Sequence, residues 1–365
     1  MSKKIRNCFY KNLTFDKLLQ AHLRARKHKT YKSELINFEI NLENNLINLK
    51  HKIENGTYRV GKYHSFKVYE PKERVIKALP YVDRIVHQWY VEEFIKPYIM
   101  PKFIFQTFAC IPDRGTHKAV EQVQNYMREF KRNYGDFWVL KCDVRKFFYS
   151  IDPYVLMNIL EKKYIADPYL LSFTRTLIFD SRDPEDIIGI PIGNYTSQFF
   201  ANIYLNELDQ YVKRSLHIKY YVRYMDDFIL LCKSKNDCIT LLNKISNFLK
   251  NYLHLDLNHK SRYYPYAMGV NFCGYRIFTT HKLLRKSSKE KIKKNLKKWN
   301  HEFNKHTINL DLAMQSLNSW IGHVDHCNGY RLKTKVLNNC NFLINAKYYS
   351  ELERYLTNAI EQDSS

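Results

Sequence analysis

Acidic side chains occupy two places in the sequence where an apolar run that indicates a strand comes to an end. Asp143 lies in KCDVRKFF, and Asp226 and Asp227 lie together in YVRYMDDFILL. If adjacent strands bring two of these carboxylates within about 4 Å, they repel each other by about 4 kcal/mol at an effective dielectric constant near 20. Such a cluster therefore needs a proton or a cation between its members.

The donor atoms indicate which cation would bind. Carboxylate oxygens with no His or Cys nearby suit Mg²⁺ better than Zn²⁺. Two Mg²⁺ ions between such carboxylates can activate a 3′-hydroxyl and stabilise a pyrophosphate leaving group in an in-line phosphoryl transfer. The implied reaction is nucleotidyl transfer. An Asp-Asp pair alone is more often a solvated turn, so this interpretation depends on the motifs around it.

Those motifs resemble the reverse transcriptase family. YMDD at Tyr224 to Asp227 matches the family's YxDD motif, and Asp143 matches its first catalytic aspartate, with the aromatic Phe148 five positions on. GIPIGNYTSQFFANIYLNELD (Gly189 to Asp209) resembles the substrate-binding motif and the helix that follows it. PKERVIKALPYVDRIVHQW resembles the fingers motif, LDLNHKS a further family block and GVNFCGYRI the primer grip. The resemblance covers about Lys72 to Ile277.

The resemblance implies roles around the metal ions. Asp143 and Asp226 would be the shared ligands of two Mg²⁺ ions, Asp227 would support them, and the Val144 carbonyl is a candidate further ligand. Phe148 would stand beneath the sugar and exclude a 2′-hydroxyl, so that deoxynucleotides are preferred. The alternative for Phe148 is a core aromatic.

The resemblance also implies contacts with the nucleotide and the nucleic acid. Arg74 and Lys72 would hold the triphosphate, which a guanidinium fork fits well, whereas the alternative is a surface charge. Gly193 would let the backbone approach the nucleotide. Lys260 would either assist the leaving phosphate or bind backbone. The other assigned residues are Ile192 and Gln198 for the nucleotide, and Gly274, Tyr275, Lys289, Lys293 and Lys297 for nucleic acid.

The substrate motif departs from the commonest family pattern. Many members have Gln-Gly and end the motif in Ser-Pro, whereas here Ile192 precedes Gly193 and the motif ends Ser197-Gln198. IGNYTSQ, like CIPDRGTHKA before it, resembles the reverse transcriptases of diversity-generating retroelements, which copy a template RNA into cDNA and misincorporate opposite adenine. Replacing an amide by Ile removes hydrogen-bonding capacity beside the nucleotide. The alternative is that Ile192 only packs against the palm.

This subgroup usually works with a small basic accessory protein, which the resemblance implies as a partner. A second interpretation is the reverse transcriptase of a retron or phage-defence system. A third, from another class, is an RNA-binding scaffold with an idle polymerase site, which the presence of all three carboxylates disfavours. Neighbouring genes would separate the first two: a template and variable repeat pair favours diversification, and a structured noncoding RNA with an effector gene favours defence.

Periodicity predicts the elements that position these residues. The expected elements are two helices between Thr14 and Ile53, a hairpin within Thr57–Pro80, a helix over Asp83–Ile95 ended by Pro97, a buried strand over Phe137–Val144, helix over Tyr154–Ile178, a loop at 181–186, a helix after Gly193 capped by Thr196 or Ser197, two strands flanking MDD, a helix over Asp237–Asn251, and short strands over Asn271–Phe278. Beyond about His281 helices dominate, and a basic helix from Ser288 places Ile292, Leu296 and Trp299 on one stripe.

These elements predict an α+β fold, which the resemblance specifies as a right-hand polymerase with a palm built on a split βαβ sheet. The predicted divisions are N-terminal fingers at 1–80, palm and fingers-palm junction at 81–152, a fingers insertion at 153–190, palm at 191–280 and a helical thumb at 281–365.

Composition agrees with a folded protein that binds polyanions. Lys and Arg number 59 against 36 Asp and Glu, a net charge of +23, while 45% hydrophobic and 15% aromatic residues are too many for a disordered basic tail. Eight scattered cysteines without a CxxC pair favour reduced thiols in the cytoplasm.

No secretory signal and no apolar run of about 20 residues is apparent, so we expect no membrane association. His323, His326 and Cys327 lack the second ligand pair of a zinc site.

Overall fold

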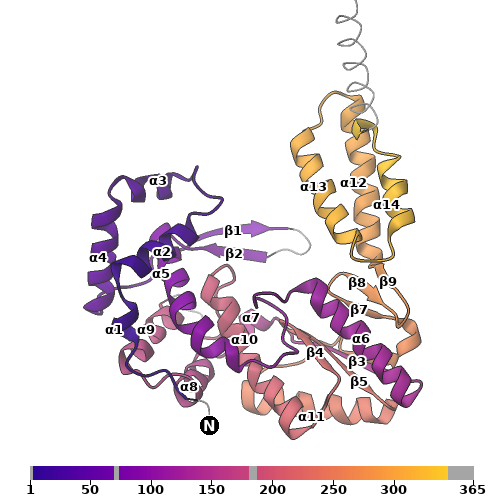
Figure 1. Ribbon diagram of the computed structural model, residues 1–365, viewed down its shortest axis with the longest axis horizontal. Coiled ribbons are helices and arrows are strands. Elements are labelled where there is room, and N and C mark those ends of the chain that lie inside the picture. The colour runs from indigo at the N-terminus through magenta and orange to yellow at the C-terminus, as the bar shows by residue number, and fades with distance from the viewer. Residues whose placement is uncertain (1–2, 70–73, 181–186, 344–365) are drawn as a thin grey trace, which may run out of the picture. The chain divides into compact units, whose positions relative to one another are not determined.

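A computed structural model describes residues 3–69, 74–180 and 187–343 (Figure 1). The chain divides into two compact units. The first comprises the chain up to Ala119 and Trp138–Tyr264, and the second comprises Val120–Phe137 and the chain from Pro265 onward. Lys72 and the loop predicted at 181–186 lie outside the described residues. The division into fingers, palm and thumb stays a prediction.

The first unit begins with four helices, not the two predicted. They are α1 (Phe9–Asn12), α2 (Phe15–Ala25), α3 (Ser33–Ile40) and α4 (Leu42–Glu54). Thr14 caps α2 by accepting a hydrogen bond from the Lys17 amide at 3.3 Å. The long helical pattern is interrupted because His28 adopts a positive φ of 60° and Asn41 has non-helical φ and ψ of −130° and 49°.

An exposed hairpin follows, as predicted. Strand β1 (His64–Val68) pairs antiparallel with β2 (Arg74–Ala78), with His64 opposite Ala78 and Val68 opposite Arg74. Every residue of β1 is exposed. The base of the hairpin is tied to the substrate motif, because the Lys77 amide donates to the Ile192 carbonyl at 3.2 Å.

The prediction that Pro97 ends the next helix is wrong. Helix α5 (Tyr81–Tyr90) continues into a π-helical segment, η1 (Val91–Ile99), and a short 3₁₀ turn, η2 (Met100–Lys102). Pro97 lies inside η1. A proline ring clashes with the preceding turn of an α-helix, and the wider π-helical turn relieves that clash. Trp89, Phe94 and Ile99 are buried along this continuous element.

A four-stranded sheet carries the predicted carboxylates. Its order is β4-β5-β3-β6, from β4 (Tyr221–Tyr224), β5 (Asp227–Cys232), β3 (Trp138–Asp143) and β6 (Arg262–Pro265). Read from β6, the strands stand fourth, first, third and second in the chain, which is the split βαβ arrangement. The predicted strand at Phe137–Val144 and the two strands around MDD are confirmed.

The first unit contains further helices, of which α11 (Lys235–Leu253) packs on β3 and β5 (Figure 1). This unit also contains α7 (Phe147–Ser150), α8 (Pro153–Lys163), α9 (Pro168–Phe179) and α10 (Tyr195–Gln210). The predicted helix over Tyr154–Ile178 is therefore two helices, because Pro168 starts a new one. The predicted caps of α10 are wrong: Asn194 is its N-cap, and the Thr196 hydroxyl bonds His87 instead.

The second unit combines most of α6 (Thr116–Tyr134) with a small sheet and three helices. The sheet order is β7-β8-β9, from β7 (Val270–Phe272), β8 (Tyr275–Ile277) and β9 (Lys282–Leu284), preceded by the 3₁₀ turn η4 (Tyr266–Met268). The helices are α12 (Lys286–Asn304), α13 (Leu310–Val324) and α14 (Tyr330–Leu337).

Strand β9 lies in a region where the sequence indicated helices only. Gln124 of α6 donates to the Phe278 carbonyl at 2.9 Å, and Arg128 donates to the Thr279 carbonyl at 2.7 Å, so α6 is tied to the strand end. Within the described ranges, no helix has both the length and the apolar character needed to cross a membrane.

Asp167 generates a stability prediction. Its buried carboxylate caps α9 through the Tyr169 and Leu170 amides and also accepts the Cys8 and Phe9 amides at 2.8 and 3.0 Å. We expect Asp167→Ala to lower the free energy of unfolding by about 3 kcal/mol, since buried donors lose their acceptor.

The matched control is Asp152→Ala. Asp152 caps α8 in the same way, but its second oxygen faces the exposed His254. This variant should lose only about 1 kcal/mol in denaturant unfolding. Equal losses in the two variants would contradict the role given to the Cys8 and Phe9 amides.

Candidate active site

Strand pairing brings the three predicted carboxylates together. In the β3–β5 ladder Asp143 lies directly opposite Asp227, and in the β4–β5 hairpin Tyr224 pairs with Asp227. Met225 and Asp226 therefore form a two-residue turn beside the end of β3. The Val144 amide donates to the Asp226 carbonyl at 3.3 Å, which fixes this turn against the strand end. Directly opposed residues in such a ladder have Cα atoms about 4.5 to 5.5 Å apart.

Neighbouring groups compensate the charge of these carboxylates. The Lys141 ammonium contacts the Asp227 carboxylate at 2.7 Å, and the Asn258 amide donates to the Asp143 carboxylate at 2.9 Å. Lys141 stands two residues before Asp143, on the same face of β3. Its position diagonal to Asp227 follows from strand alternation, but sequence reasoning gave Lys141 no role.

The carboxylates fit a hard cation in donor type. In the described part of the chain, no three His, Cys, Asp or Glu side chains form a ready-made metal-binding group. Asp227 is directed to Lys141, and the supporting role given to it stays a prediction. Asp143 and Asp226 then offer carboxylate oxygens, the ligands that Mg²⁺ prefers. The Val144 side chain is buried, and its amide is used by Asp226.

The loop before β6 supports Asp143 from the other side. The backbone amide of Asn258 donates to the Asp143 carbonyl at 2.7 Å, in addition to the bond from the Asn258 side chain to the Asp143 carboxylate. The backbone amide of Asp143 donates to the Ser261 hydroxyl at 3.2 Å. Lys260 lies in this loop with an exposed side chain. Asn258 and Ser261 belong to the LDLNHKS motif, but the sequence assigned them no function.

The substrate motif is held next to α7. The Ile190 amide donates to the Phe148 carbonyl and the Gly189 amide to the Ile151 carbonyl, both at 2.8 Å. Phe148 is half-buried and meets Phe147 edge-on, with ring centroids 5.6 Å apart. The structure therefore places Phe148 beside the motif with which it is predicted to act.

Gly193 closes the motif against the hairpin. Its φ is +125°, and an added Cβ would stand 2.7 Å from the Lys77 carbonyl oxygen. Only glycine fits this approach. The contact gives Gly193 a structural reason in addition to the nucleotide contact predicted for it.

A cavity of about 280 Å³ opens between β2, α5 and the start of α10. Six of the residues that line it are cationic, polar or predicted nucleotide contacts: Lys29, Lys77, Arg84, His87, Gly193 and Gln198. The three cationic side chains suit an anionic ligand. Lys29 was missed because it stands far from the motifs in the sequence, and Arg84 lies within the fingers motif but was given no role.

His87 anchors the start of α10. Its side chain is fully buried, and its Nδ1 lies 2.7 Å from the Thr196 hydroxyl. Burial lowers the pKa of His87 to about 3, so the imidazole is neutral at neutral pH. No sequence signal separated His87 from an ordinary core histidine.

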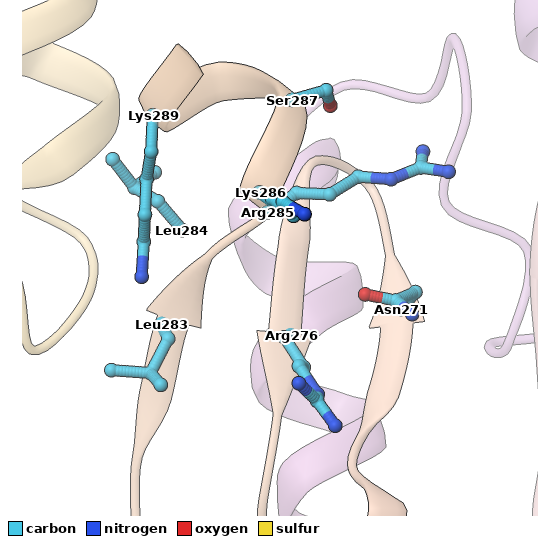
Figure 2. A pocket seen from close by; sticks show the side chains of 8 residues that line it. All are labelled: Asn271, Arg276, Leu283, Leu284, Arg285, Lys286, Ser287 and Lys289. Atoms are coloured by element: carbon cyan, nitrogen blue, oxygen red, sulfur yellow. The ribbon is translucent and has the colours of Figure 1, made fainter.

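The second unit contains a basic pocket of about 460 Å³ (Figure 2). Its cationic residues come from β8 and from the start of α12: Arg276, Arg285, Lys286 and Lys289. The N-terminus of a helix adds its own positive potential. Lys293 and Lys297 are exposed further along α12 at a spacing of four residues, so they share a face with Lys289.

Gly274 and Tyr275 fix β8 against α13. Tyr275 is fully buried, and its hydroxyl donates to the His323 carbonyl at 2.7 Å. Gly274 has a φ of +86°, and a Cβ there would lie 2.8 Å from His323 Nε2. A contact of Tyr275 with nucleic acid would therefore have to use its backbone.

A split βαβ sheet that carries carboxylates at a strand end and on the adjoining hairpin turn defines a polymerase palm. Residues 66–277 match the family described as reverse transcriptase (RNA-dependent DNA polymerase), which is more than half of the chain. The chain belongs to this family, and its fold is the right-hand polymerase fold predicted from the sequence.

Individual relatives are distant. The chain is 24% identical over 240 residues to a putative COX1/OXI3 intron 2 protein of Saccharomyces cerevisiae, covering 49% of this chain and 27% of that protein. It is 23% identical over 296 residues to the group II intron-encoded protein LtrA of Lactococcus lactis subsp. cremoris, covering 62% and 48%. It thus spans less than half the length of either relative.

Among solved structures, telomerase from Candida albicans in complex with a TWJ fragment of telomeric RNA is similar at 12% identity and a TM-score of 0.45. The similarity covers 83% of this chain and 67% of that chain.

Gly193 generates an activity prediction. In Gly193→Ala the new methyl would collide with the Lys77 carbonyl and displace the substrate motif from β2. We expect nucleotide incorporation to fall by about 100-fold, since a displacement of about 1 Å in a substrate site has this effect.

Gly115→Ala is the matched control. Gly115 has a similar φ of +118°, but an added Cβ there meets nothing within 4 Å. It should share the backbone strain of about 1 to 3 kcal/mol in unfolding experiments and keep most of its activity. If the two variants lose activity equally, the Gly193–Lys77 contact has no special role.

Proposed function

We propose that this protein synthesises DNA on an RNA template from deoxynucleoside triphosphates. The observation that carries the proposal is the β3–β5 register, which sets Asp143 opposite Asp227 and next to the Met225–Asp226 turn. Asp143 and Asp226 would hold two Mg²⁺ ions, with Asp227 and the Val144 carbonyl in support. When bound, these ions lower the barrier to attack by the primer 3′-hydroxyl and stabilise the charge on the leaving pyrophosphate.

The chain's own residues bind and orient the substrates. Lys72 and Arg74 hold the triphosphate, and Lys260 neutralises the leaving phosphate. Phe148 excludes a 2′-hydroxyl from the nucleotide site. Ile192, Gly193 and Gln198 form the surface that the nascent base pair contacts.

The template-primer duplex binds along basic surfaces. The exposed Lys293 and Lys297, with Lys289, contact backbone phosphates, and Gly274 and Tyr275 shape the primer grip that leads into α12. A net charge of +23 supports this assignment, because phosphate contacts supply affinity that does not depend on sequence.

We further propose that the enzyme belongs to a diversity-generating retroelement, where it makes error-prone cDNA together with a small basic accessory protein. The support is Ile192 beside Gly193 and Gln198 after Ser197, which differ from the Gln-Gly and Ser-Pro of many members. The eight cysteines are scattered and include no CxxC pair, which supports the proposal of a reducing, cytoplasmic setting.

Removing Asp226 tests the polymerase assignment. Asp226→Ala should abolish incorporation of deoxynucleotides on a primed RNA template in Mg²⁺, by a factor of about 10³ or more, while thermal unfolding stays close to that of the wild type. Asp16→Asn, which removes an exposed carboxylate on α2, should keep full activity. Wild-type incorporation by Asp226→Ala would refute the site assignment.

Restoring an amide at position 192 tests the subgroup assignment. The wild-type cDNA should carry errors concentrated opposite template adenines, and Ile192→Gln should reduce these errors several-fold because the amide regains hydrogen bonds beside the nucleotide. Sequencing of cDNA made on one defined RNA measures both spectra. The control is Ile190→Val, a small change at a buried position of the same motif. An even error spectrum in the wild type argues against the subgroup.

A further inference from the structure

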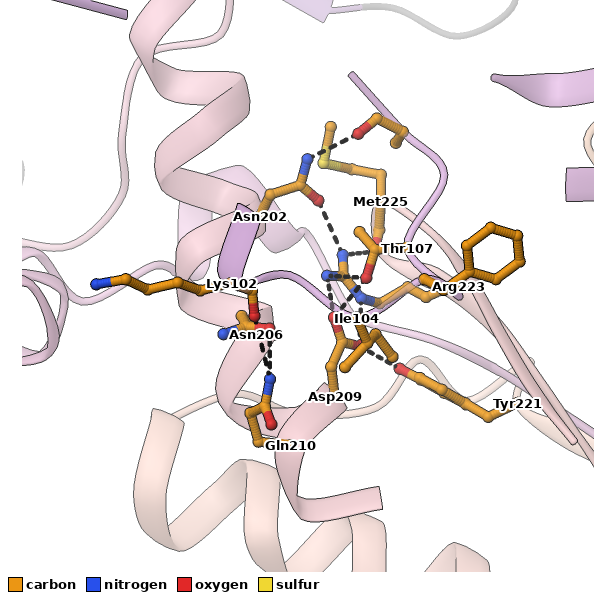
Figure 3. A network of polar contacts seen from close by, with 12 residues as sticks. Lys102, Ile104, Thr107, Asn202, Asn206, Asp209, Gln210, Tyr221, Arg223 and Met225 are labelled. Atoms are coloured by element: carbon orange, nitrogen blue, oxygen red, sulfur yellow. Dashed lines mark hydrogen bonds and ion pairs between the residues drawn. The ribbon is translucent and has the colours of Figure 1, made fainter. Parts of the chain in front are cut away.

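An arginine directly before the YMDD motif is fully buried with a carboxylate of the substrate-motif helix (Figure 3). Arg223 Nε and Nη2 donate to the two oxygens of Asp209 on α10, at 2.7 and 2.6 Å. Both side chains have no exposed surface. Burial alone would lower the pKa of Arg223, but the contact with Asp209 more than offsets this and raises it. Arg223 therefore stays positively charged in the buried site.

The network around this pair uses every donor of the guanidinium. Nη1 donates to the Asn202 side chain at 3.0 Å and to the Met225 carbonyl at 2.9 Å, and Nη2 has a long contact of 3.5 Å with the Thr107 hydroxyl. Asp209 also accepts the Tyr221 and Thr107 hydroxyls at 2.7 and 2.8 Å. A planar fork can satisfy these directions together, whereas a lysine ammonium cannot.

The contact with Met225 reaches the catalytic turn. Met225 has a φ of +55°, a conformation that costs a side-chain-bearing residue about 1 to 3 kcal/mol and persists only where neighbours hold it. Arg223 holds the Met225 carbonyl, and the Val144 amide holds the next carbonyl, that of Asp226. Two successive carbonyls are thus fixed. The Met225 carbonyl is held by Arg223, which is itself bonded to α10, and the Asp226 carbonyl is held at the strand end that bears Asp143.

Stability alone is a weak reason for such a pair. A buried ion pair often contributes no more to folding than apolar residues of the same volume, since desolvation offsets the attraction. The pair nevertheless joins two motifs, because Asp209 ends the substrate-motif segment and Arg223 begins the segment with the catalytic aspartates. Among the described contacts, the Arg223 guanidinium reaches the turn only through its bond to the Met225 carbonyl.

We propose that Arg223, oriented by Asp209 and Asn202, is a positioning residue that holds the Met225–Asp226 turn in its strained conformation and so aligns Asp226 for nucleotidyl transfer. This inference rests on the proposed polymerase function. It assigns to the Arg223–Asp209 pair a role in the rate of the chemical step and not in substrate affinity.

The test is Arg223→Lys, which keeps a positive charge next to Asp209 but loses the fork that reaches Met225. We expect kcat to fall by about 10- to 100-fold, while KM for dNTP and Kd for the RNA–DNA template-primer change less than about twofold. Amide hydrogen exchange, measured without Mg²⁺ or nucleotide, should become faster in the peptide that contains residues 224–228 and stay unchanged in α11.

Tyr221→Phe is the matched control. It removes one hydrogen bond to the same Asp209 oxygen without touching the turn. It should lower the melting temperature but leave kcat and exchange at residues 224–228 as in the wild type. If Arg223→Lys does not fold, Asn202→Ala removes the acceptor of the nitrogen that holds Met225, together with the bond from the Asn202 side chain to the Ala109 carbonyl, and should lower kcat by about three- to tenfold.

The outcomes separate the two proposals. An inactive wild type refutes the polymerase function itself. An active wild type with equal kcat and equal exchange in Arg223→Lys and Tyr221→Phe overturns only the positioning role. A loss confined to KM or to template-primer binding also overturns it, because a positioning residue for the turn acts on kcat.

Discussion

Repulsion between like charges is the constraint on which this structure depends. Asp143 and Asp227 pair directly across β3 and β5, and Asp226 lies in the adjoining turn, so three acidic residues are gathered at one end of the sheet. Each of these residues has its own support. Lys141 contacts the Asp227 carboxylate, the Asn258 side chain donates to the Asp143 carboxylate, and the Val144 amide holds the backbone of the turn that carries Asp226. The β3–β5 ladder makes the arrangement possible, because its hydrogen bonds hold in place charges that would otherwise separate.

Hydrogen bonds connect the ladder to the helix that follows the substrate motif. Asp209 and Asn202 on α10 reach Arg223 on β4, and Thr196 at the start of the same helix reaches His87 on α5. One helix thereby connects the Met225–Asp226 turn with the wall of the cavity that β2 also lines. Burial of these polar contacts makes them directional, since an unpaired group in the same place would be costly.

The sequence predicted the features that depend on local pattern. Short apolar runs located β3 and the two strands of the YMDD hairpin, and the resemblance indicated that Asp143 would meet Asp226. Features that depend on tertiary contact were not predictable. Nothing local shows that Pro97 can lie inside a widened helix, or that Thr196 bonds His87 instead of capping α10. Lys141, His87 and Arg223 look ordinary in the sequence because their partners are strands or helices away.

The contact between Gly193 and Lys77 restricts how this enzyme can diverge. Any side chain at position 193 would enter the space of a backbone carbonyl, which cannot move without the whole hairpin. Variation at this point of the chain is thus channelled to neighbouring positions such as Ile192, where a different side chain need not enter the space of that carbonyl. Among natural relatives with this hairpin geometry, position 193 should stay glycine while its neighbours vary.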